Sequence, residues 1–216
     1  MAMNQGRKNI PGTLQAFKEF ARDKLAYLVL DMDKVSGGGW NIPSLCREFN
    51  IPPDRIRIRD AFIKVGIQDL RSRYCALDFH SVLAFREGFG LPHLEAMACG
   101  VPTCAQDYCS GTEICEDNRG VLVPVLDYIT YGTWGNARDR HPDIPWLVNS
   151  ITNLYEHPSI LADISRRGYE WAIRRTWDQA ANEVEDLIRQ VMGDQFYVGN
   201  QKPVNSVPKS SGSDDS

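Results

Sequence analysis

Apolar residues recur along the chain in two patterns that alternate with one another. Short apolar or alternating runs, each followed by a turn or loop, predict β-strands. Longer stretches with apolar residues three and four positions apart predict amphipathic α-helices. The predicted strands span residues 25–33, 54–62, 79–85, 101–107 and 118–126, and the predicted helices span 11–24, 42–51, 66–78, 92–100, 145–156, 159–174 and 177–192.

This order of strands and helices predicts an α/β fold. The run Leu25–Asp33 is almost continuously apolar, which is typical of a strand buried on both faces of a parallel sheet. We therefore expect a Rossmann-like, mostly parallel, doubly wound sheet with helices on both faces, followed by C-terminal helices. In such a sheet a ligand binds beyond the carboxyl ends of the strands, where the strand order reverses.

Several residues mark where the predicted helices begin and end. Gly12 or Thr13 is expected to cap the first helix, and Gly100 is expected to end the helix that starts at Pro92. Thr176 and Gln179 have the spacing of a capping box for the last helix. Residues 130–145 show neither the strand pattern nor the helix pattern of apolar residues, so we expect a long loop of the kind that is functional or mobile.

The chain is long enough for one sizeable domain, which we place at residues 1–194. Residues 195–216 are polar and are expected to form a disordered tail. The last helix carries a wide apolar face, which either packs on the domain's own sheet or contacts another protein. That face comprises Trp177, Ala181, Val184, Ile188 and Val191.

Composition narrows the classes of function. A net charge of −4 and a pI near 5.6 argue against nucleic acid as a partner. No apolar run is long enough to span a membrane, and the first residues do not resemble a secretory signal. We expect a cytoplasmic protein, with peripheral membrane contact left open. The six cysteines form no C-x-x-C pair and are expected to be reduced thiols, and the four scattered histidines suggest no metal site.

Residues 86–102, REGFGLPHLEAMACGVP, combine features that a turn or a helix alone does not need. The residues before Pro92 offer no side-chain oxygen to the first amides of the helix, so these amides form an anion site. Glu87 and Glu95 lie on either side of that helix start, and carboxylates suit vicinal sugar hydroxyls. Together they indicate a nucleotide sugar. The alternative is a tight turn and a glutamate that stabilises the helix dipole.

The stretch E-G-F-G-L-P-x-L-E-A-M-A-C-G-V-P also resembles a known signature. It is similar to the E-x7-E motif of retaining glycosyltransferases of the GT-B fold, in glycosyltransferase family four (glycosyl transferases group 1). Further segments share the resemblance, including GRKNIPGTLQAF, SGTEICEDNRGVLVPV and TWDQAANEVEDLI, so that it covers about residues 4–192. Ala84 departs from the pattern, which usually has serine there.

The resemblance implies roles for named residues. Glu87 would contact the donor sugar, and Glu95 would hold the ribose hydroxyls. Arg7 and Lys8 would neutralise the departing nucleoside diphosphate, because fixed cations stabilise that developing charge without a metal. We therefore expect neither metal nor cofactor, and a nucleotide diphosphate sugar as donor substrate. The backbone that would face the sugar and the distal phosphate comprises Gly88, Phe89, Gly90 and Leu91.

The likeness covers only the donor-binding, C-terminal half of a GT-B enzyme. We expect the family's first strand to be truncated here, because only Met1–Met3 precede Asn4. A missing N-terminal acceptor domain or chain is therefore an expected partner. Two functions stay open: a hexosyltransferase acting with retention on an unknown acceptor, or a non-catalytic nucleotide-sugar-binding remnant or subunit. A dinucleotide-binding oxidoreductase is disfavoured, since no G-x-G-x-x-G turn is present.

Overall fold

The structure is a computed structural model that describes residues 4–34, 37–59, 65–131 and 137–192. The chain divides into two units, residues 1–174 and residues 175–216, which we describe separately. The domain boundary expected at residue 194 stays a prediction, and the expected tail 195–216 lies outside the described residues.

The first unit contains two parallel sheets. In one, β1 (Leu28–Asp31) pairs with β2 (Ile56–Arg59). In the other, the order is β3 (His80–Val82), β4 (Thr103–Gln106) and β5 (Val121–Val123). The predicted mostly parallel α/β fold is confirmed. The expected continuous sheet is nevertheless divided, because β1 and β3 do not pair with each other within the described residues.

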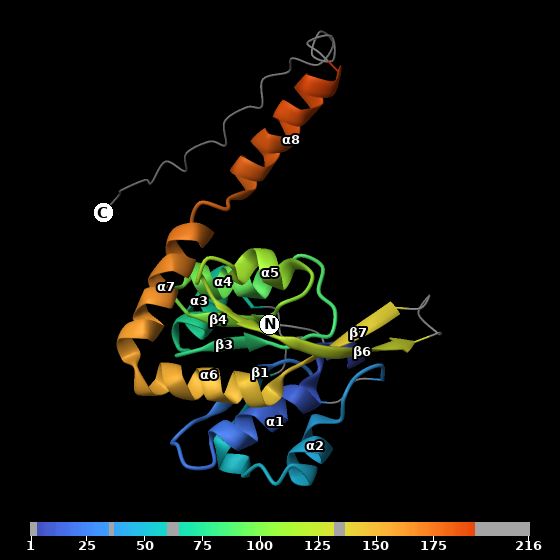
Figure 1. The fold of residues 1–216 in the computed structure, drawn as a ribbon, viewed down its shortest axis with the longest axis vertical. Helices are drawn as coiled ribbons and strands as arrows, with labels where there is room; N and C mark the ends of the chain where they lie inside the picture. The colour runs from blue at the N-terminus through green and yellow to red at the C-terminus, as the bar shows by residue number, and fades with distance from the viewer. Residues whose placement is uncertain (1–3, 35–36, 60–64, 132–136, 193–216) are drawn as a thin grey trace, which may run out of the picture. The chain divides into compact units, whose positions relative to one another are not determined.

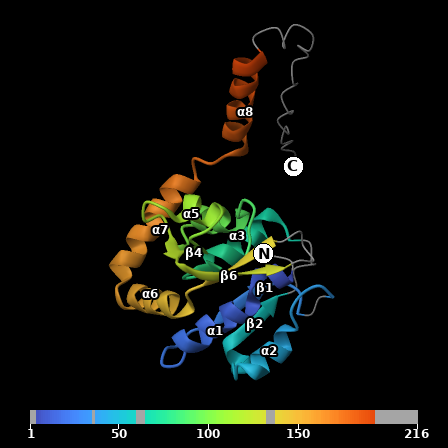
Figure 2. The ribbon, with the colours of Figure 1, turned by 45° about the vertical axis from the view of Figure 1, so that its right-hand side comes forward.

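Helices cover both faces of the β3–β4–β5 sheet (Figures 1 and 2). One face packs on α4 and α5, and the other packs on α1 and α6. The helices of this unit are α1 (Ile10–Phe20), α2 (Ile42–Glu48), α3 (Ile67–Cys75), α4 (Leu91–Ala98), α5 (Ser110–Cys115), α6 (Ile144–Glu156) and α7 (Pro158–Ala172), with short 3₁₀ helices η1 (Gly6–Lys8) and η2 (Pro53–Arg55).

Helix α1 joins the two sheets through its buried face. Ile10 and Leu14 pack into a cluster with Leu30 of β1, whereas Ala16 belongs to the cluster around Cys104 of β4. The two sheets are therefore held together by side-chain packing on one shared helix. Burial of such apolar side chains contributes about 1.5–3 kcal/mol each.

Two of the predicted helix ends need correction. Asn9 caps α1, because its left-handed backbone (φ 46°) lets its side chain accept from the Gly12 N–H at 3.2 Å, so Gly12 and Thr13 are not the cap. Pro92 is the second residue of α4, and the cap is Gly90. The predicted end at Gly100 is confirmed: its φ is +72°, and its N–H and that of the next residue return to carbonyls of the last turn, which is a Schellman motif.

The prediction of a long loop at residues 130–145 is wrong for the residues that the structure describes. Strands β6 (Val125–Tyr131) and β7 (Ala137–Pro142) form an antiparallel hairpin (Figure 1), and residues 132–136 lie outside the description. The sequence did not predict these strands, because β7 has charged residues at positions where a strand usually has apolar ones. The guanidinium groups of Arg138 and Arg140 each lie 4.8 Å from the ring of Tyr128, so cross-strand stacking replaces the usual apolar pairs.

The second unit contains α8 (Trp177–Met192), which matches the predicted helix. Thr176 accepts from the Gln179 N–H at 3.1 Å, whereas the Gln179 side chain bonds to Glu183, so only half of the expected capping box forms. What its apolar face packs against stays a prediction. No helix within the described ranges is long and apolar enough to cross a membrane.

Candidate functional site

The N-terminal segment is fixed at the carboxyl end of β1. The buried side chain of Asn4 donates to the carbonyls of Asp33 (3.0 Å) and Trp40 (2.7 Å) and accepts from the Trp40 N–H (2.8 Å). A Cβ at Gly39 would lie 2.3 Å from the Asn4 carbonyl oxygen, so only glycine permits this approach. The chain therefore enters the fold through a close contact that follows β1.

The same segment is also tied to the carboxyl end of β3. The Phe85 N–H donates to the Arg7 carbonyl at 2.8 Å, three residues beyond Val82. Helix η1, which carries Arg7 and Lys8, is thereby held between the ends of two strands from different sheets. The doubly wound topology predicts a ligand site at this position.

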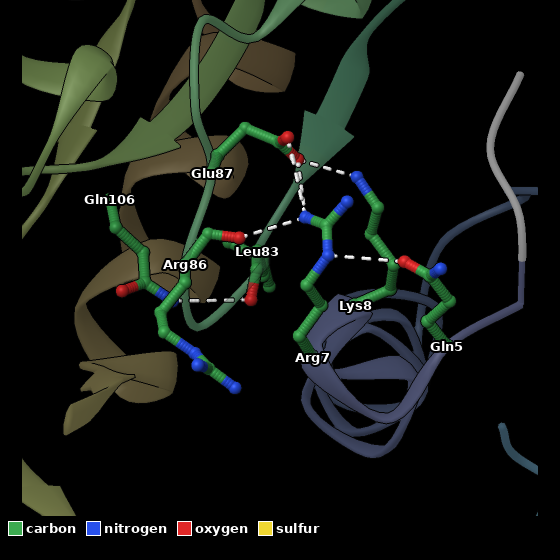
Figure 3. Close-up of polar contacts among 7 residues, drawn as sticks. All are labelled: Gln5, Arg7, Lys8, Leu83, Arg86, Glu87 and Gln106. Carbon is green, nitrogen blue, oxygen red and sulfur yellow. Dashed lines mark hydrogen bonds and ion pairs between the residues drawn. The ribbon is translucent and has the colours of Figure 1, made fainter. Parts of the chain in front are cut away.

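Arg7 and Lys8 both contact Glu87 (Figure 3). The Lys8 Nζ lies 2.5 Å from Glu87 Oε2, and Arg7 Nη1 lies 3.3 Å from both carboxylate oxygens. Arg7 Nη1 also donates to the Arg86 carbonyl at 2.9 Å, and Arg7 Nε donates to Gln5 at 3.1 Å. The adjacent residues Arg7 and Lys8 thus form one cluster with Glu87, which lies 80 and 79 positions further along the sequence.

Burial and charge act in opposite directions on Glu87. Burial disfavours its charged form, but the hydrogen bond and charge of Lys8, together with Arg7, outweigh burial and lower its pKa. Lys8 is 9% exposed and Arg7 35% exposed, so the arginine is the cation more open to solvent. The cluster contains two cations and one anion, and it therefore keeps a net positive charge.

The loop after Glu87 leads into α4 without capping its amides. Gly90 has φ +84° and supplies no cap side chain. Within the described residues, the N–H groups of Gly88, Gly90 and Leu91 donate to no backbone or side-chain acceptor. This fits the predicted anion site, because the first amides of a helix attract negative charge.

A buried hydroxyl adjoins this loop. Ser110 Oγ lies 3.5 Å from the place that a Cβ on Gly90 would take, and within the described residues it has no hydrogen-bond partner. Buried polar groups without partners are rare in folded proteins. Sequence reasoning missed Ser110, because the signature that marks the loop ends before it.

Glu95 has a different partner from Glu87. The Tyr74 hydroxyl donates to Glu95 Oε2 at 2.7 Å, and Tyr74 is buried. Burial first, and then the hydrogen bond and charge of Glu95, raise the pKa of Tyr74 far above its ordinary value. The hydroxyl therefore stays protonated and fixes one oxygen of the carboxylate. The contact of Tyr74 with Glu95 was not predicted from the sequence, in which Tyr74 lies in the helix expected at residues 66–78.

The buried His93 of α4 and the half-buried His80 of β3 share one hydroxyl. His80 Nδ1 and His93 Nδ1 lie 2.8 Å and 2.9 Å from Thr103 Oγ1. Burial lowers the pKa of His93 to about 4, with Glu87 opposing and Lys8 adding to the effect. Burial and then His93 also lower the pKa of His80. Both rings are neutral at pH 7 and support the helix. The polar residues His80 and Thr103 within two predicted strands were the signal for this cluster.

The carboxylate of Asp31 at the end of β1 holds two arginines. Arg59 Nη2 lies 2.7 Å from Oδ2, and Arg73 Nη1 lies 3.3 Å from Oδ1. This cluster joins β1, β2 and α3 beside the candidate site. It was not predicted, since the three residues come from separate segments.

Comparison with known proteins finds a similarity to one family in the central part of the chain. Residues 63–129 match the family model Glycosyl transferases group 1. The match includes Glu87, Glu95 and the loop between them. It supports a glycosyltransferase of this group.

Individual proteins agree with the family match. The chain is 31% identical over 129 residues to a D-inositol 3-phosphate glycosyltransferase of Saccharomonospora viridis, covering 59% of this chain and 26% of that one. It is 25% identical over 194 residues to a GDP-mannose:cellobiosyl-diphosphopolyprenol alpha-mannosyltransferase of Komagataeibacter xylinus, covering 84% and 46%.

A solved structure shows the shared fold. Sucrose-phosphate synthase from Thermosynechococcus elongatus aligns with a TM-score of 0.66 and 24% identity, over 86% of this chain and 43% of that one. The predicted fold, one half of a GT-B architecture, is confirmed by this likeness. The chain spans less than half the length of each of these three proteins.

Proposed function

We propose that the chain is the donor-binding half of a retaining GT-B glycosyltransferase of family four. It would bind a nucleotide diphosphate sugar, from which a hexose passes to an acceptor. One observation carries this proposal: Arg7, Lys8 and Glu87 meet directly before the uncapped start of α4. The name of one relative includes a nucleotide diphosphate sugar, GDP-mannose, as its donor.

The cluster suits the departure of a nucleoside diphosphate. Lys8 and Arg7 supply positive charge that Glu87 holds in place before the ligand arrives. When the bond from sugar to phosphate breaks, negative charge grows on the leaving diphosphate, and fixed cations stabilise it without reorganising. The amides at Gly88–Leu91 would face the same phosphate and the sugar. With two cations in place, the proposal needs no metal ion.

The carboxylates have separate tasks in this proposal. Glu87 contacts the hydroxyls of the donor sugar, since it directly precedes the loop. Glu95 holds the ribose, and the Tyr74 hydroxyl on Oε2 fixes the direction of the other oxygen. A carboxylate oxygen fixed in this way binds a hydroxyl with little loss of side-chain entropy. Ser110, buried without a partner near Gly90, gives the ligand one further polar contact.

The acceptor side belongs to an N-terminal domain or a separate chain. The chain spans between 26% and 46% of the relatives named above, which supports this part of the proposal. We also propose a cytoplasmic location. All six cysteines are free, which is typical of a reducing compartment.

Calorimetric titration tests the proposal directly. The folded chain is titrated with UDP-, GDP- and ADP-sugars and with the matching nucleoside diphosphates. We expect one base series to bind, and Glu95→Gln to weaken binding about tenfold or more, because a hydrogen bond to a charged group is lost. Glu156→Gln, an exposed change at the end of α6, is the matched control. If the folded chain gives no heat with any of these nucleotides, the proposal is wrong.

Mixing the chain with an acceptor-domain polypeptide separates enzyme from binding module. Release of nucleoside diphosphate that depends on both chains supports catalysis. Nucleotide binding that persists without turnover under the same conditions favours the non-catalytic subunit.

A further inference from the structure

The strand β7 packs against the loop that follows β3. The Arg140 N–H donates to the Phe85 carbonyl at 3.4 Å, and the ring centroids of His141 and Phe85 lie 5.0 Å apart. Beside them, Arg86 Nε forms an ion pair with Asp139 Oδ1 at 2.5 Å. Three consecutive residues of β7 thus contact two consecutive residues of the loop, through the backbone, a ring and a charge.

The same loop also contacts η1. The Phe85 N–H donates to the Arg7 carbonyl at 2.8 Å, and the Arg86 carbonyl accepts from Arg7 Nη1 at 2.9 Å. In Figure 3 this carbonyl faces Arg7, whereas the Arg86 guanidinium points away from Glu87. Arg86 therefore connects two groups of charges: its backbone holds a cation of the candidate site, and its side chain holds Asp139.

Asp139 is a buried acid in a strand whose two arginines face the other way. Its exposed fraction is 6%, whereas Arg138 and Arg140 both stack on the Tyr128 ring. Successive residues of a strand point to opposite faces of the sheet. The Asp139 carboxylate is therefore directed away from this stack and toward Arg86.

An ion pair in this position adds direction more than stability. The cost of taking two charges out of water offsets most of their attraction, so an apolar pair of similar size would stabilise the fold equally well or better. A planar guanidinium meets a carboxylate only in a narrow range of geometries. The pair of Arg86 and Asp139 therefore fixes where the Arg86 main chain lies, and with it the carbonyl that Arg7 contacts.

The strand β7 also contacts a second loop beside the candidate site. The Arg140 guanidinium carbon lies 5.1 Å from the ring centroid of Tyr108 and 4.8 Å from that of Tyr128, so the cation stacks on both rings. Tyr108 lies between β4 and α5, two residues before Ser110, whose buried Oγ adjoins Gly90. One short strand is thus fixed to the loops that follow β3 and β4, and these two loops meet at Gly90.

We propose that Asp139 is a positioning residue for the candidate site. Through Arg86 it holds the main-chain carbonyl on Arg7. Arg7 and Lys8 together hold the Glu87 carboxylate. The effect of Asp139 on a bound nucleoside diphosphate rests on the proposed function, whereas its effect on Glu87 is measured without a ligand.

The Glu87 carboxylate reports on its own contacts. Burial raises its pKa, but Lys8 and Arg7 outweigh burial and lower the pKa. Carboxyl carbon-13 shifts are titrated in the full wild-type chain, in Asp139→Asn and in Asp163→Asn, a matched change at an ion-paired aspartate on the surface of α7. If Asp139 sets the contact with Arg7, the pKa of Glu87 rises in Asp139→Asn and stays unchanged in Asp163→Asn.

The sign of the change separates positioning from a simple effect of charge. Loss of the Asp139 carboxylate removes a like charge, which by itself lowers the pKa of Glu87. The double variant Arg86→Met/Asp139→Leu removes one charge of each sign, so the direct effects offset, and it leaves no buried charge unpaired. It therefore also serves if Asp139→Asn does not fold. We expect a raised pKa of Glu87 in both variants, and an unchanged or lower pKa in the double variant would overturn the proposal.

Calorimetric titration with UDP, GDP and ADP tests the connection to the ligand. For the diphosphate that binds the wild-type chain, affinity should fall on the order of tenfold in Asp139→Asn and in the double variant, and stay normal in Asp163→Asn. Thermal unfolding is measured alongside. Asp139→Asn should unfold about 10 °C lower because it leaves Arg86 unpaired, and the double variant should recover most of that loss.

Two results of the titration have different meanings. An affinity that recovers in the double variant together with the unfolding temperature would show that Asp139 only stabilises the fold, and would overturn the proposal. If the wild-type chain binds none of the three diphosphates, the proposed function is wrong, and the pKa of Glu87 alone then decides whether Asp139 positions its contact with Arg7.

Discussion

The two ends of α4 differ in how their backbone groups are satisfied. At the carboxyl end, Gly100 and Val101 return their N–H groups to Met97 and Ala96, which completes the Schellman motif. At the amino end, Gly90 offers no cap, and Gly88 and Leu91 donate to no acceptor among the described residues. The same eight-residue helix thus has one end that is complete within the protein and one that is not. The incomplete end lies beside two cations, which is what an anion site requires.

Acid should destabilise the amino-terminal end of α4 before it destabilises the carboxyl-terminal end. His93 lies in the first turn, and burial, opposed by Glu87 and reinforced by Lys8, lowers its pKa to about 4 from the ordinary 6.5. Between pH 6.5 and about 4, His93 therefore binds a proton in the unfolded chain but stays neutral in the folded one. The contribution of neutral His93 to folding stability is thus full above pH 6.5 and is lost as the pH falls toward 4. The loss is on the order of 3 kcal/mol.

Urea unfolding at pH 7.0 and pH 4.5 measures this loss. The comparison uses the wild-type chain and His93→Gln, whose side chain does not titrate. The difference in unfolding free energy between the two pH values should be smaller in His93→Gln. An equal pH dependence in the two proteins would show that His93 is not the group responsible.

Removing one of the two cations should affect only ligand binding at the amino-terminal end of α4. Lys8→Met leaves Arg7 to hold Glu87. Binding of the nucleoside diphosphate should weaken about 100-fold, because a charge-assisted contact to phosphate is lost. Lys18→Met, an exposed change on α1, is the matched control and should bind normally. Calorimetric titration decides the matter, and a change of less than threefold in Lys8→Met contradicts the proposed role.

The two left-handed glycines give the most direct comparison of the ends. Gly90→Ala places a Cβ 3.0 Å from His93 and 3.1 Å from Ile114 as well as at φ +84°, and should cost about 2–3 kcal/mol. Gly100→Ala meets nothing within 4 Å and pays only for φ +72°, about 1 kcal/mol. Urea unfolding measures both changes. Equal losses would mean that the packing around Gly90 yields, and that its end of α4 is not preorganised.

The smallest effect is expected at the Glu95 contact. Tyr74→Phe removes the hydroxyl at 2.7 Å but keeps the ring, so nucleotide binding should weaken several-fold, by about 1 kcal/mol. Tyr169→Phe, on the half-exposed ring of α7, is the control. Unchanged affinity in Tyr74→Phe would show that the ligand does not depend on the direction of Glu95.

The sequence predicted β1 to β5, most of the α-helices and the end of α4, because each depends on local pattern, but it did not predict the short helix α5. The range of α8 and the turn at Gly100 both follow from neighbouring residues. The hairpin β6–β7 was missed because Arg138 and Arg140 occupy positions where apolar residues are expected in a strand. Local pattern does not show which side chains stack across two strands.

For the candidate site, residue types were predictable and partners were not. Glu87, Arg7 and Lys8 were named from the signature and the resemblance, and the structure brings them together. That Tyr74 holds Glu95 could not be read from the sequence, since it depends on how α3 packs on α4. The roles of these residues toward a ligand stay a prediction.

The hydroxyl of Thr103 carries a single hydrogen, although two imidazoles lie within reach of it. If that hydrogen points to one Nδ1, the other ring must present an N–H to the oxygen, so the two neutral rings are opposite tautomers. Neither ring can change alone, because reversing one reverses the other. Nitrogen chemical shifts of His80 and His93 should therefore form a complementary pair, and Thr103→Val would release each ring to choose its own form.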